Sequence, residues 1–516
     1  MIASTMDFNT LMDNLANFIA KMGEYFASAD CSRAIELLKY NPQEPLLFSS
    51  GLFLFLFAAF MLGYVLLSKR NEARMLFVTL FSYYFFYKSS GFYFALLAAV
   101  TLIDFLAARR IPDSKHPRWW LALSLLADLG MLGYFKYTNF FAGMVSQMLE
   151  FNFQPWDIFL PVGISFYTFK SLSYVIDVYR GKIKPMNSLL DYAFYVSYFP
   201  TLLAGPIERA DHFHPQTRQP LRISSEMFAL GVYFVLAGLM KKVVISDYIA
   251  QNFVDRVFDN PLLFSGGEVL LAMYGYCIQI YSDFSGYSDM AIGISLLLGF
   301  RLKMNFDAPF KADSMSDFWR RWHISLSTWI RDYVYISLGG NRHGKVRMYL
   351  NQMIAMTACG LWHGASLNFV VWGALHGFLV CLHKFWSQTI MGHDRHYHPM
   401  GIRRFFSVFI TFHVVCFSWL FFRCRDFDGV AQMLRQLIGK FNPGVLPDVL
   451  VSYKYVFLLM ATALIAHWLP KGWQDGCVGL LRKTGVVGAA VVATVVIFLV
   501  MQVKSSDIQP FIYFQF

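Results

Sequence analysis

Long apolar runs without a charged side chain constrain the fold of this chain more than any other feature. Residues 51–68 and 486–503 contain no Asp, Glu, Lys or Arg, and each run is close to the roughly 20 residues that a helix needs to cross a bilayer. Of the 516 residues, 56% are apolar and 15% are charged, whereas soluble domains average about 25% charged residues. The sequence therefore excludes a soluble enzyme, a secreted module and a disordered scaffold, and predicts an all-α polytopic membrane protein.

The positive charge of the chain gathers in alternate loops. The formal net charge is +11, and basic loops of membrane proteins face the cytoplasm, so the charge indicates orientation in the membrane and no nucleic-acid partner. Three clusters of basic residues follow one another along the first half of the chain. The first contains Lys69, Arg70 and Arg74, the second contains Arg109, Arg110, Lys115 and Arg118, and the third contains Arg180, Lys182 and Lys184. The seven cysteines are widely spaced and mostly lie in apolar stretches, so we expect neither a disulfide framework nor a zinc site.

The apolar segments predict roughly eleven to thirteen membrane elements. They lie near residues 51–68, 75–89, 91–108, 119–136, 158–178, 190–205, 226–245, 265–282, 286–300, 350–385, 402–422, 452–468 and 484–503. As one helix, residues 350–385 would be about 54 Å long, too long for a single upright crossing. We expect this segment to break near Gly360–Gly364 or Gly373.

The N-terminal residues 1–45 are predicted to be an extension, separate from the membrane domain of residues 46–516. Acidic and basic residues interrupt the extension before any long apolar run, so we expect no cleavable signal there. Its apolar residues recur at helical spacing, which fits either an amphipathic helix on the membrane or a cap packed on the core.

Residues 301–347 form a polar segment between the apolar runs. A helix starting near Ser316 and Asp317 is predicted, too polar to span lipid, with Arg320 and His323 on one face. The Arg320 guanidinium would lower the pKa of His323 and keep its imidazole neutral. The alternative is an interfacial helix anchored by Trp and Arg residues. The basic loop 339–347 fits either phosphate binding or a cytoplasmic turn.

A second histidine, His363, lies in an apolar stretch with no charged residue for a dozen positions on either side. An ionisable group buried in a membrane segment is costly, so it is a functional-site hypothesis, with a hydrogen-bonded structural histidine as the alternative. The histidines His376, His383 and His413 are interpreted as core or interfacial residues, and those at 212, 214, 393, 396 and 398 as loop residues without metal-site spacing. For Asp283 and Asp289, helix capping or ion pairing is expected.

A buried neutral histidine reached through a basic cytoplasmic opening fits acyl transfer from a thioester to a hydroxyl, which needs a base and donors for the developing oxyanion. Proton-coupled transport also uses such a residue. Seven motifs resemble the membrane-bound O-acyltransferase family, and most closely its bacterial alginate O-acetyltransferase branch. They are LPVGISFYTF (160–169), YVIDVYR (174–180), FPTLLAGPI (199–207), DFSGYSDMAIG (283–293), FWRRWHISLSTW (318–329), RDY (331–333) and GLWHGAS (360–366).

The resemblance implies a helical bundle around a central tunnel, in the bacterial inner membrane and in contact with membrane lipid. His363 matches the intramembrane histidine of the family, and His323 the second histidine of this branch; both are expected to be catalytic. Acetyl-CoA is the implied acyl donor, with no permanently bound cofactor and no metal, and Arg320 and Arg321 are expected to bind donor phosphates or to anchor the helix. The implied acceptor is a hydroxyl of alginate, another exopolysaccharide or peptidoglycan, or a periplasmic acetyltransferase partner.

Two other functions stay open on the residues alone. A transporter or flippase for a polysaccharide precursor or an acyl donor would use the same passage without making a bond. A scaffold for a cell-surface assembly would tolerate substitution of its histidines. A D-alanyl donor, as in the teichoic-acid branch of the family, is a further alternative to acetyl.

Overall fold

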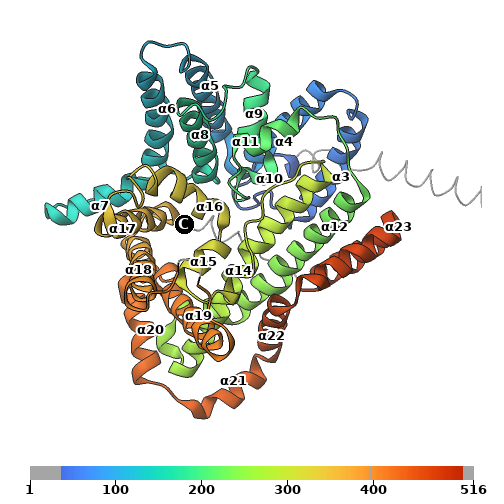
Figure 1. Ribbon diagram of the computed structural model, residues 1–516. Helices are drawn as coiled ribbons and strands as arrows, with labels where there is room; N and C mark the ends of the chain where they lie inside the picture. The colour runs from blue at the N-terminus through green and yellow to red at the C-terminus, as the bar shows by residue number, and fades with distance from the viewer. Residues whose placement is uncertain (1–35, 395–396, 504–516) are drawn as a thin grey trace, which may run out of the picture.

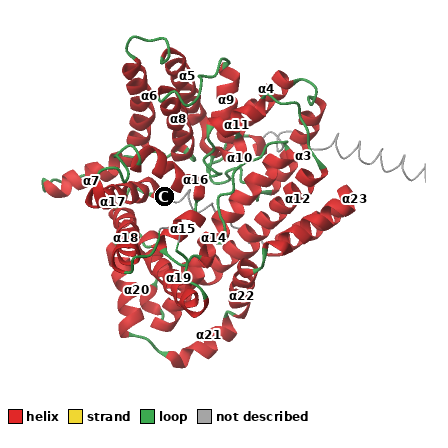
Figure 2. Ribbon diagram, viewed as in Figure 1, coloured by secondary structure: helices red, strands yellow, loops and turns green. Residues whose placement is uncertain are grey.

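The structure is a computed structural model that describes residues 36–394 and 397–503. Helices follow one another along this part of the chain, and no strand occurs within these two ranges (Figure 2). The predicted all-α fold is confirmed. Most of the predicted N-terminal extension, with its amphipathic helix, lies outside the described residues.

The first predicted apolar segments each form a helix. These are α3 (Gly51–Leu66), α4 (Asn71–Ser90), α5 (Phe94–Arg110) and α6 (Pro117–Leu132), followed by the π-helical turn η2 (Gly133–Tyr137) and α7 (Thr138–Met148). Local sequence explains two of the starts. The Ser50 hydroxyl accepts the Phe53 N–H at 3.2 Å and caps α3, and Pro117 occupies the first position of α6, where a missing N–H costs nothing.

The middle of the chain consists of shorter helices. These are α8 (Ile164–Tyr179), α9 (Leu189–Ser197), α10 (Phe199–Leu202), α11 (Ala210–Thr217), α12 (Ser225–Leu239), the π-helical turns η3 (Met240–Asp247) and η4 (Ala250–Val254), and α13 (Asp255–Asp259). The predicted segment 190–205 is divided between α9 and α10, because the chain turns at Tyr198, with Pro200 in the first turn of α10.

One long helix, α14 (Gly266–Leu297), replaces the two elements predicted at 265–282 and 286–300. The polar residues between them do not end the helix, because its two aspartates pair with lysines of η3. Lys242 Nζ lies 2.5 Å from Asp283 Oδ1, and Lys241 Nζ lies 2.6 Å from Asp289 Oδ2. The prediction that these aspartates form ion pairs is confirmed, and the predicted break between the two segments is wrong.

The polar segment also differs from its prediction. It forms two short helices, α15 (Met315–Arg321) and α16 (Ile324–Trp329), followed by the π-helical turn η7 (Ile330–Tyr335). The chain breaks between them because Trp322 is extended and His323 has a left-handed backbone with φ of 41°. A left-handed conformation is uncommon outside glycine and ends the α15 helix.

The predicted break in the segment 350–385 is confirmed. Helix α17 (Gly344–His363) ends at the histidine, and α18 (Leu367–Lys384) starts after Gly364–Ser366 and runs through Gly373 without a break. The chain continues with the π-helical turn η8 (Phe385–Ile390) and helices α19 (Gly401–Arg423), α20 (Phe427–Gly439), α21 (Leu446–Ser452), α22 (Lys454–Trp468) and α23 (Lys471–Val503).

Five helical stretches within the described residues are long and apolar enough to cross a membrane. They are Asn71–Arg110, Ser225–Asp259, Leu367–Ile390, Gly401–Arg423 and Lys471–Val503, and a sixth stretch, Pro443–Ser452 with Lys454–Trp468, is bent by 88°. The other predicted elements are shorter or more polar than this criterion, so the predicted number of eleven to thirteen stays a prediction. A tunnel that joins the two faces of the membrane also stays a prediction.

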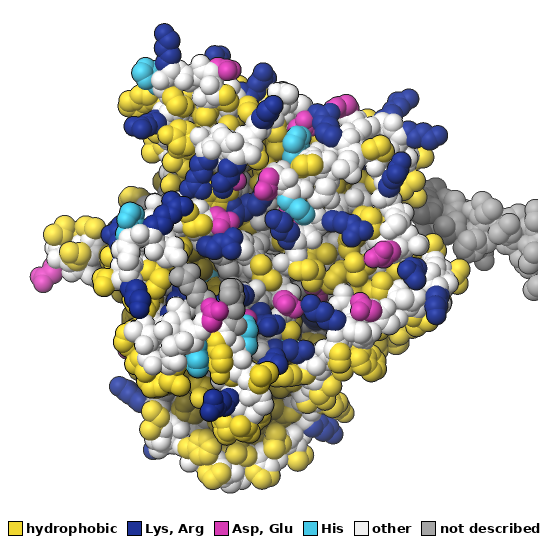
Figure 3. Space-filling model, viewed as in Figure 1, with side chains coloured by type: hydrophobic (Ala, Val, Ile, Leu, Met, Phe, Trp, Pro, Cys, Tyr) yellow, Lys and Arg dark blue, Asp and Glu magenta, His cyan; other side chains and the backbone are white. Residues whose placement is uncertain are grey.

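The polar helices lie inside the bundle. In Figure 1, α15 and α16 are near the middle of the molecule, with α8, α14, α17, α18 and α19 around them. The same face carries Lys and Arg side chains across its middle, whereas hydrophobic side chains follow much of its outline (Figure 3). This arrangement surrounds a polar centre with apolar helices that suit lipid.

Candidate active site

His363 is the last residue of α17, and it is buried, with 2% of its surface exposed. Its imidazole packs edge-on against Trp372 of α18, with ring centroids 5.2 Å apart, and against Phe422 of α19 at 5.3 Å. The helix hairpin α17–α18 and helix α19 therefore hold the ring in a water-poor aromatic setting. Electrostatic interactions are strong in such surroundings.

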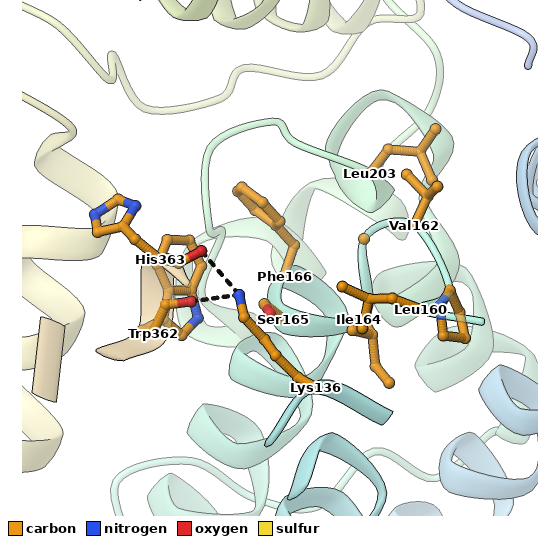
Figure 4. A pocket seen from close by; sticks show the side chains of 11 residues that line it. Lys136, Leu160, Val162, Ile164, Ser165, Phe166, Leu203, Trp362 and His363 are labelled. Atoms are coloured by element: carbon orange, nitrogen blue, oxygen red, sulfur yellow. Dashed lines mark hydrogen bonds between the residues drawn. The ribbon is translucent and has the colours of Figure 1, made fainter. Parts of the chain in front are cut away.

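Lys136 and Tyr137 of η2 bind the end of α17. Lys136 Nζ donates to the carbonyl oxygens of Trp362 at 2.6 Å and His363 at 3.0 Å, and the Tyr137 hydroxyl donates to Leu361 at 2.9 Å. The last carbonyls of a helix have no partner within it and carry partial negative charge, so a cation there stabilises the end. In Figure 4 Lys136 reaches these carbonyls while the His363 imidazole points to the other side.

A small cavity adjoins this contact. Its volume is about 70 Å³, and its lining includes Lys136, Leu203, Trp362, His363 and the chain from Leu160 to Phe166 (Figure 4). A water molecule needs about 10–15 Å³ on this measure. The cavity is large enough for a few water molecules or for a group of a few atoms.

His323 is held by Asn305, a residue to which the sequence analysis gave no role. His323 is fully buried, and its Nδ1 lies 3.2 Å from Asn305 Oδ1. The same oxygen accepts the backbone N–H of Ser325 at 3.1 Å and the Ser325 hydroxyl at 2.9 Å, while Asn305 Nδ2 donates to the Ser288 hydroxyl at 3.1 Å. Asn305 thus joins α14 to the start of α16.

These contacts decide which ring nitrogen of His323 carries the proton. A backbone N–H can only donate, so the Asn305 atom facing Ser325 must be the oxygen. The His323 Nδ1 next to that oxygen must then be the donor, which leaves the lone pair of the neutral ring on Nε2. His323 is therefore oriented with Nε2 as its basic nitrogen.

The neutral state of His323 has a different cause from the one predicted. Burial lowers the pKa of this imidazole well below its ordinary value. Arg320 does not share a helix face with His323, because α15 ends at Arg321 and the chain turns before the histidine. Arg320 is exposed whereas His323 is buried, so the predicted pairing of the two residues on one face is wrong.

The structure brings the two predicted histidines together. The ring centroids of His323 and His363 are 6.4 Å apart, and the Trp362 ring lies 5.9 Å from His323 and 5.0 Å from His363. Phe284 of α14 packs edge-on against His323 at 4.5 Å. Two imidazoles from segments 40 residues apart thus lie in one aromatic cluster.

The two predicted arginines lie in different surroundings. Arg321 is paired with Asp317 at 2.8 Å and lies 3.8 Å from Asp307, so it anchors α15 to the preceding loop. Arg320 lines a separate cavity of about 340 Å³ together with Asn341 of the predicted basic loop and Lys384 of α18. Arg320 thus lies in a cavity whose described lining contains Lys384 as a second cation and Asp394 as an acid.

His376 is a structural histidine, as predicted. The Trp319 Nε1–H donates to its Nδ1 at 3.3 Å, and its Nε2 lies 2.9 Å from the Ser418 hydroxyl. Both ring nitrogens are therefore bonded within the protein core. Its proton is on Nε2, because indole nitrogen can only donate and Nδ1 must accept.

Comparison with known proteins gives a consistent result. The family model described as MBOAT, membrane-bound O-acyltransferase family, matches residues 182–422, a range that contains both His323 and His363. A protein named probable alginate O-acetylase AlgI from Azotobacter vinelandii is 36% identical over 91% of this chain and 100% of its own. The protein of the same name from Pseudomonas aeruginosa is 39% identical over 76% of this chain and 75% of its own. A peptidoglycan O-acetyltransferase from Helicobacter pylori is 34% identical over 76% and 80%.

Proposed function

Because the chain belongs to the membrane-bound O-acyltransferase family, we propose that it moves an acetyl group from cytoplasmic acetyl-CoA to a hydroxyl on the far side of the membrane. The acceptor is a polysaccharide such as alginate, or a periplasmic acetyltransferase that passes the group on. The chain is a multi-pass membrane protein and an O-acyltransferase. The bacterial inner membrane is its proposed location, because the proposed donor and acceptor lie on opposite sides of that membrane.

The observation that carries the proposal is the pair of buried imidazoles His323 and His363 in one aromatic cluster, 6.4 Å apart. A general base must be neutral and close to the proton that it removes. Asn305 and Ser325 orient His323 so that Nε2 is basic, and the aromatic rings exclude water that would hydrolyse a thioester.

The proposed reaction has one bond forming and one breaking. The acceptor hydroxyl attacks the thioester carbonyl, and His363 removes the hydroxyl proton as the carbon–oxygen bond forms. The carbon–sulfur bond then breaks, and the leaving thiolate of coenzyme A receives a proton. That proton is the one held by the His363 imidazolium, and His323 relays it on the cytoplasmic side by accepting it on neutral Nε2 and releasing it to the thiolate, so that both rings end neutral.

One cavity supports coenzyme A as the donor. The cavity of about 340 Å³ at Arg320 offers a guanidinium to the phosphates of the donor, since arginine binds phosphate through paired hydrogen bonds.

The test uses the full-length protein in sealed vesicles with acetyl-CoA that carries a radioactive acetyl group. Alginate oligosaccharide is present on the opposite side of the membrane. Label on the oligosaccharide hydroxyls, formed by the wild type and lost in His363→Ala, is the expected result. Accumulation of intact acetyl-CoA or of unlabelled sugar in the vesicles would instead indicate a transporter, and would overturn the proposal.

A further inference from the structure

A second basic cavity lies away from the histidines, where the starts of α4 and α12 and the end of α14 meet. Its volume is about 670 Å³, and Arg74, Arg222 and Arg301 line it. None of the described residues that line it is an Asp or a Glu. Three cations therefore face one hollow whose described walls carry no acid.

Arg74 is the unusual member of the three because it is buried. Only 3% of its surface is exposed, and its Nη2 donates to Asn71 Oδ1 at 2.6 Å and to the Gln219 carbonyl at 3.5 Å. Its Nη1 is buried and has no hydrogen-bond partner within residues 36–394 and 397–503. Both bonded oxygens belong to neutral groups, and the guanidinium lies 5.7 Å from the centroid of the Tyr64 ring. Within residues 36–394 and 397–503, Arg74 thus has an aromatic ring and two neutral oxygens as partners and no salt bridge to a carboxylate.

Arg218, a neighbouring arginine, shows how the charge of a guanidinium is usually balanced by carboxylates. Arg218, on the same end of the bundle, is paired with both Glu72 and Asp191, although 41% of its side chain is exposed. A buried charge without an opposite charge is costly, and the cost grows with burial. Arg74 is more buried than Arg218 and lacks the carboxylates, so an anion from outside the described chain would fit its surroundings.

The exposed arginines alone would not require a ligand. Arg222 and Arg301 are exposed, and a preference for basic residues on the cytoplasmic side accounts for such residues in loops. That preference does not account for burial of Arg74 beside them. A buried guanidinium without a carboxylate partner among the described residues, two exposed guanidinium groups and an open hollow occur together here, and this combination indicates a built anion site.

We propose that this cavity binds a phosphate group, separately from the donor and acceptor of acyl transfer. Arginine matches phosphate geometry with two parallel hydrogen bonds. Leu221, Met227 and Phe300 add apolar lining, which suits the glycerol and upper acyl region of an acidic phospholipid. Basic pockets between helices on the cytoplasmic side are typical sites for acidic head groups. Free phosphate from the cytoplasm has the same chemistry, and the experiment distinguishes the two sources.

The experiment measures thermal unfolding of the full-length protein in detergent micelles. One series adds dioleoyl phosphatidylglycerol or, as the neutral comparison, dioleoyl phosphatidylcholine. The other series adds sodium pyrophosphate at constant ionic strength. A ligand that binds only the folded state raises the unfolding temperature in proportion to its occupancy. The variants are Arg74→Gln and the double variant Arg222→Gln/Arg301→Gln, whose exposed residues can change without disturbing packing.

Arg70→Gln is the matched control, because Arg70 is an exposed arginine that precedes α4 and does not line the cavity. In the wild type and in Arg70→Gln we expect a rise of several degrees with phosphatidylglycerol and none with phosphatidylcholine. The double variant should need at least about tenfold more anionic ligand for the same rise. A rise with phosphatidylglycerol alone identifies a lipid head group, and an equal rise with pyrophosphate identifies a soluble phosphate.

Two results would overturn the proposal. One is a wild type that responds to neither anion. The other is a response that Arg70→Gln weakens as much as the double variant does, because that would reflect general surface charge. Acyl transfer is measured on the same samples. The ligand-dependent change in unfolding temperature tests the anion site, and the rate of acyl transfer tests the proposed reaction, so failure of one proposal is distinguished from failure of the other.

Discussion

His323 and His376 are both fully buried, yet their surroundings give them opposite properties. Indole and hydroxyl groups occupy the two nitrogens of His376, and its proton is fixed on Nε2. Asn305 fixes the proton of His323 on Nδ1 and leaves Nε2 as the basic nitrogen, in an aromatic cluster shared with His363. Burial alone therefore does not decide which nitrogen of a histidine carries the proton. The hydrogen-bond partners decide it.

The largest effect is expected at His363. Replacing it with alanine should lower acetyl transfer by about 100-fold to 10,000-fold, the usual contribution of a general base. The measurement is initial rate with labelled acetyl-CoA, normalised to folded protein. His413→Ala is the control, since this half-buried histidine of α19 bonds the Phe409 carbonyl and packs against Tyr274 and Phe412, away from the pair of His323 and His363. Activity within twofold of wild type in His363→Ala would remove the role proposed for this ring.

The next effect tests how His323 is oriented. Asn305→Ala should lower the rate about tenfold, because His323 loses the acceptor that selects its tautomer. A double variant with His323→Ala should be no slower than His323→Ala alone, since Asn305 acts through the histidine. Rates of the two single variants and the double variant are measured together. Additive losses would show that Asn305 acts independently of His323.

Arg320 lies three residues before His323 in the sequence. Arg320→Gln should raise the KM for acetyl-CoA about tenfold and leave kcat within twofold, since a charge-assisted hydrogen bond contributes about 1.5–3 kcal/mol. Arg331→Gln, which changes an exposed arginine of η7, is the control. An unchanged KM in Arg320→Gln would exclude donor binding in the cavity of about 340 Å³.

The smallest effect on the reaction is expected at His376. His376→Ala should lower stability by about 1–3 kcal/mol, because Trp319 and Ser418 lose a buried partner. The rate per folded molecule should stay within twofold of wild type. Thermal unfolding in detergent and the rate on the same sample separate the two quantities. A hundredfold loss of rate with unchanged stability would show that His376 takes part in the reaction. It would contradict the assignment of His376 as a structural residue, in contrast to His323.

Much of the fold could be predicted because apolar segments and their breaks are local properties. Helices α3 to α6 and the break after His363 follow from apolar runs and from glycine. The continuity of α14 could not be predicted, since Asp283 and Asp289 are accommodated by lysines of η3, more than 30 residues away. The break at His323 also depends on tertiary contacts, because its left-handed backbone is held by Asn305.

The candidate site is predictable in part for the same reason. An ionisable residue in an apolar stretch is visible in the sequence, and this rule identifies His363. The same rule applied to Lys136, a lone lysine at the end of the predicted segment 119–136, would have found the cation that binds the end of α17. Asn305 carries no comparable signal, since neutral amides are common in loops and its partner is 18 residues away.

The hairpin that holds His363 depends on two glycines. A Cβ on Gly360 would lie 2.2 Å from the Phe369 carbonyl and 2.9 Å from Gly373 Cα, so the backbones of α17 and α18 touch there. A single added methyl group at Gly360 would act as a wedge three residues before the imidazole. Substitutions at this contact are therefore good candidates for temperature-sensitive variants. In such a variant the protein is still inserted into the membrane, but the imidazole of His363 is displaced.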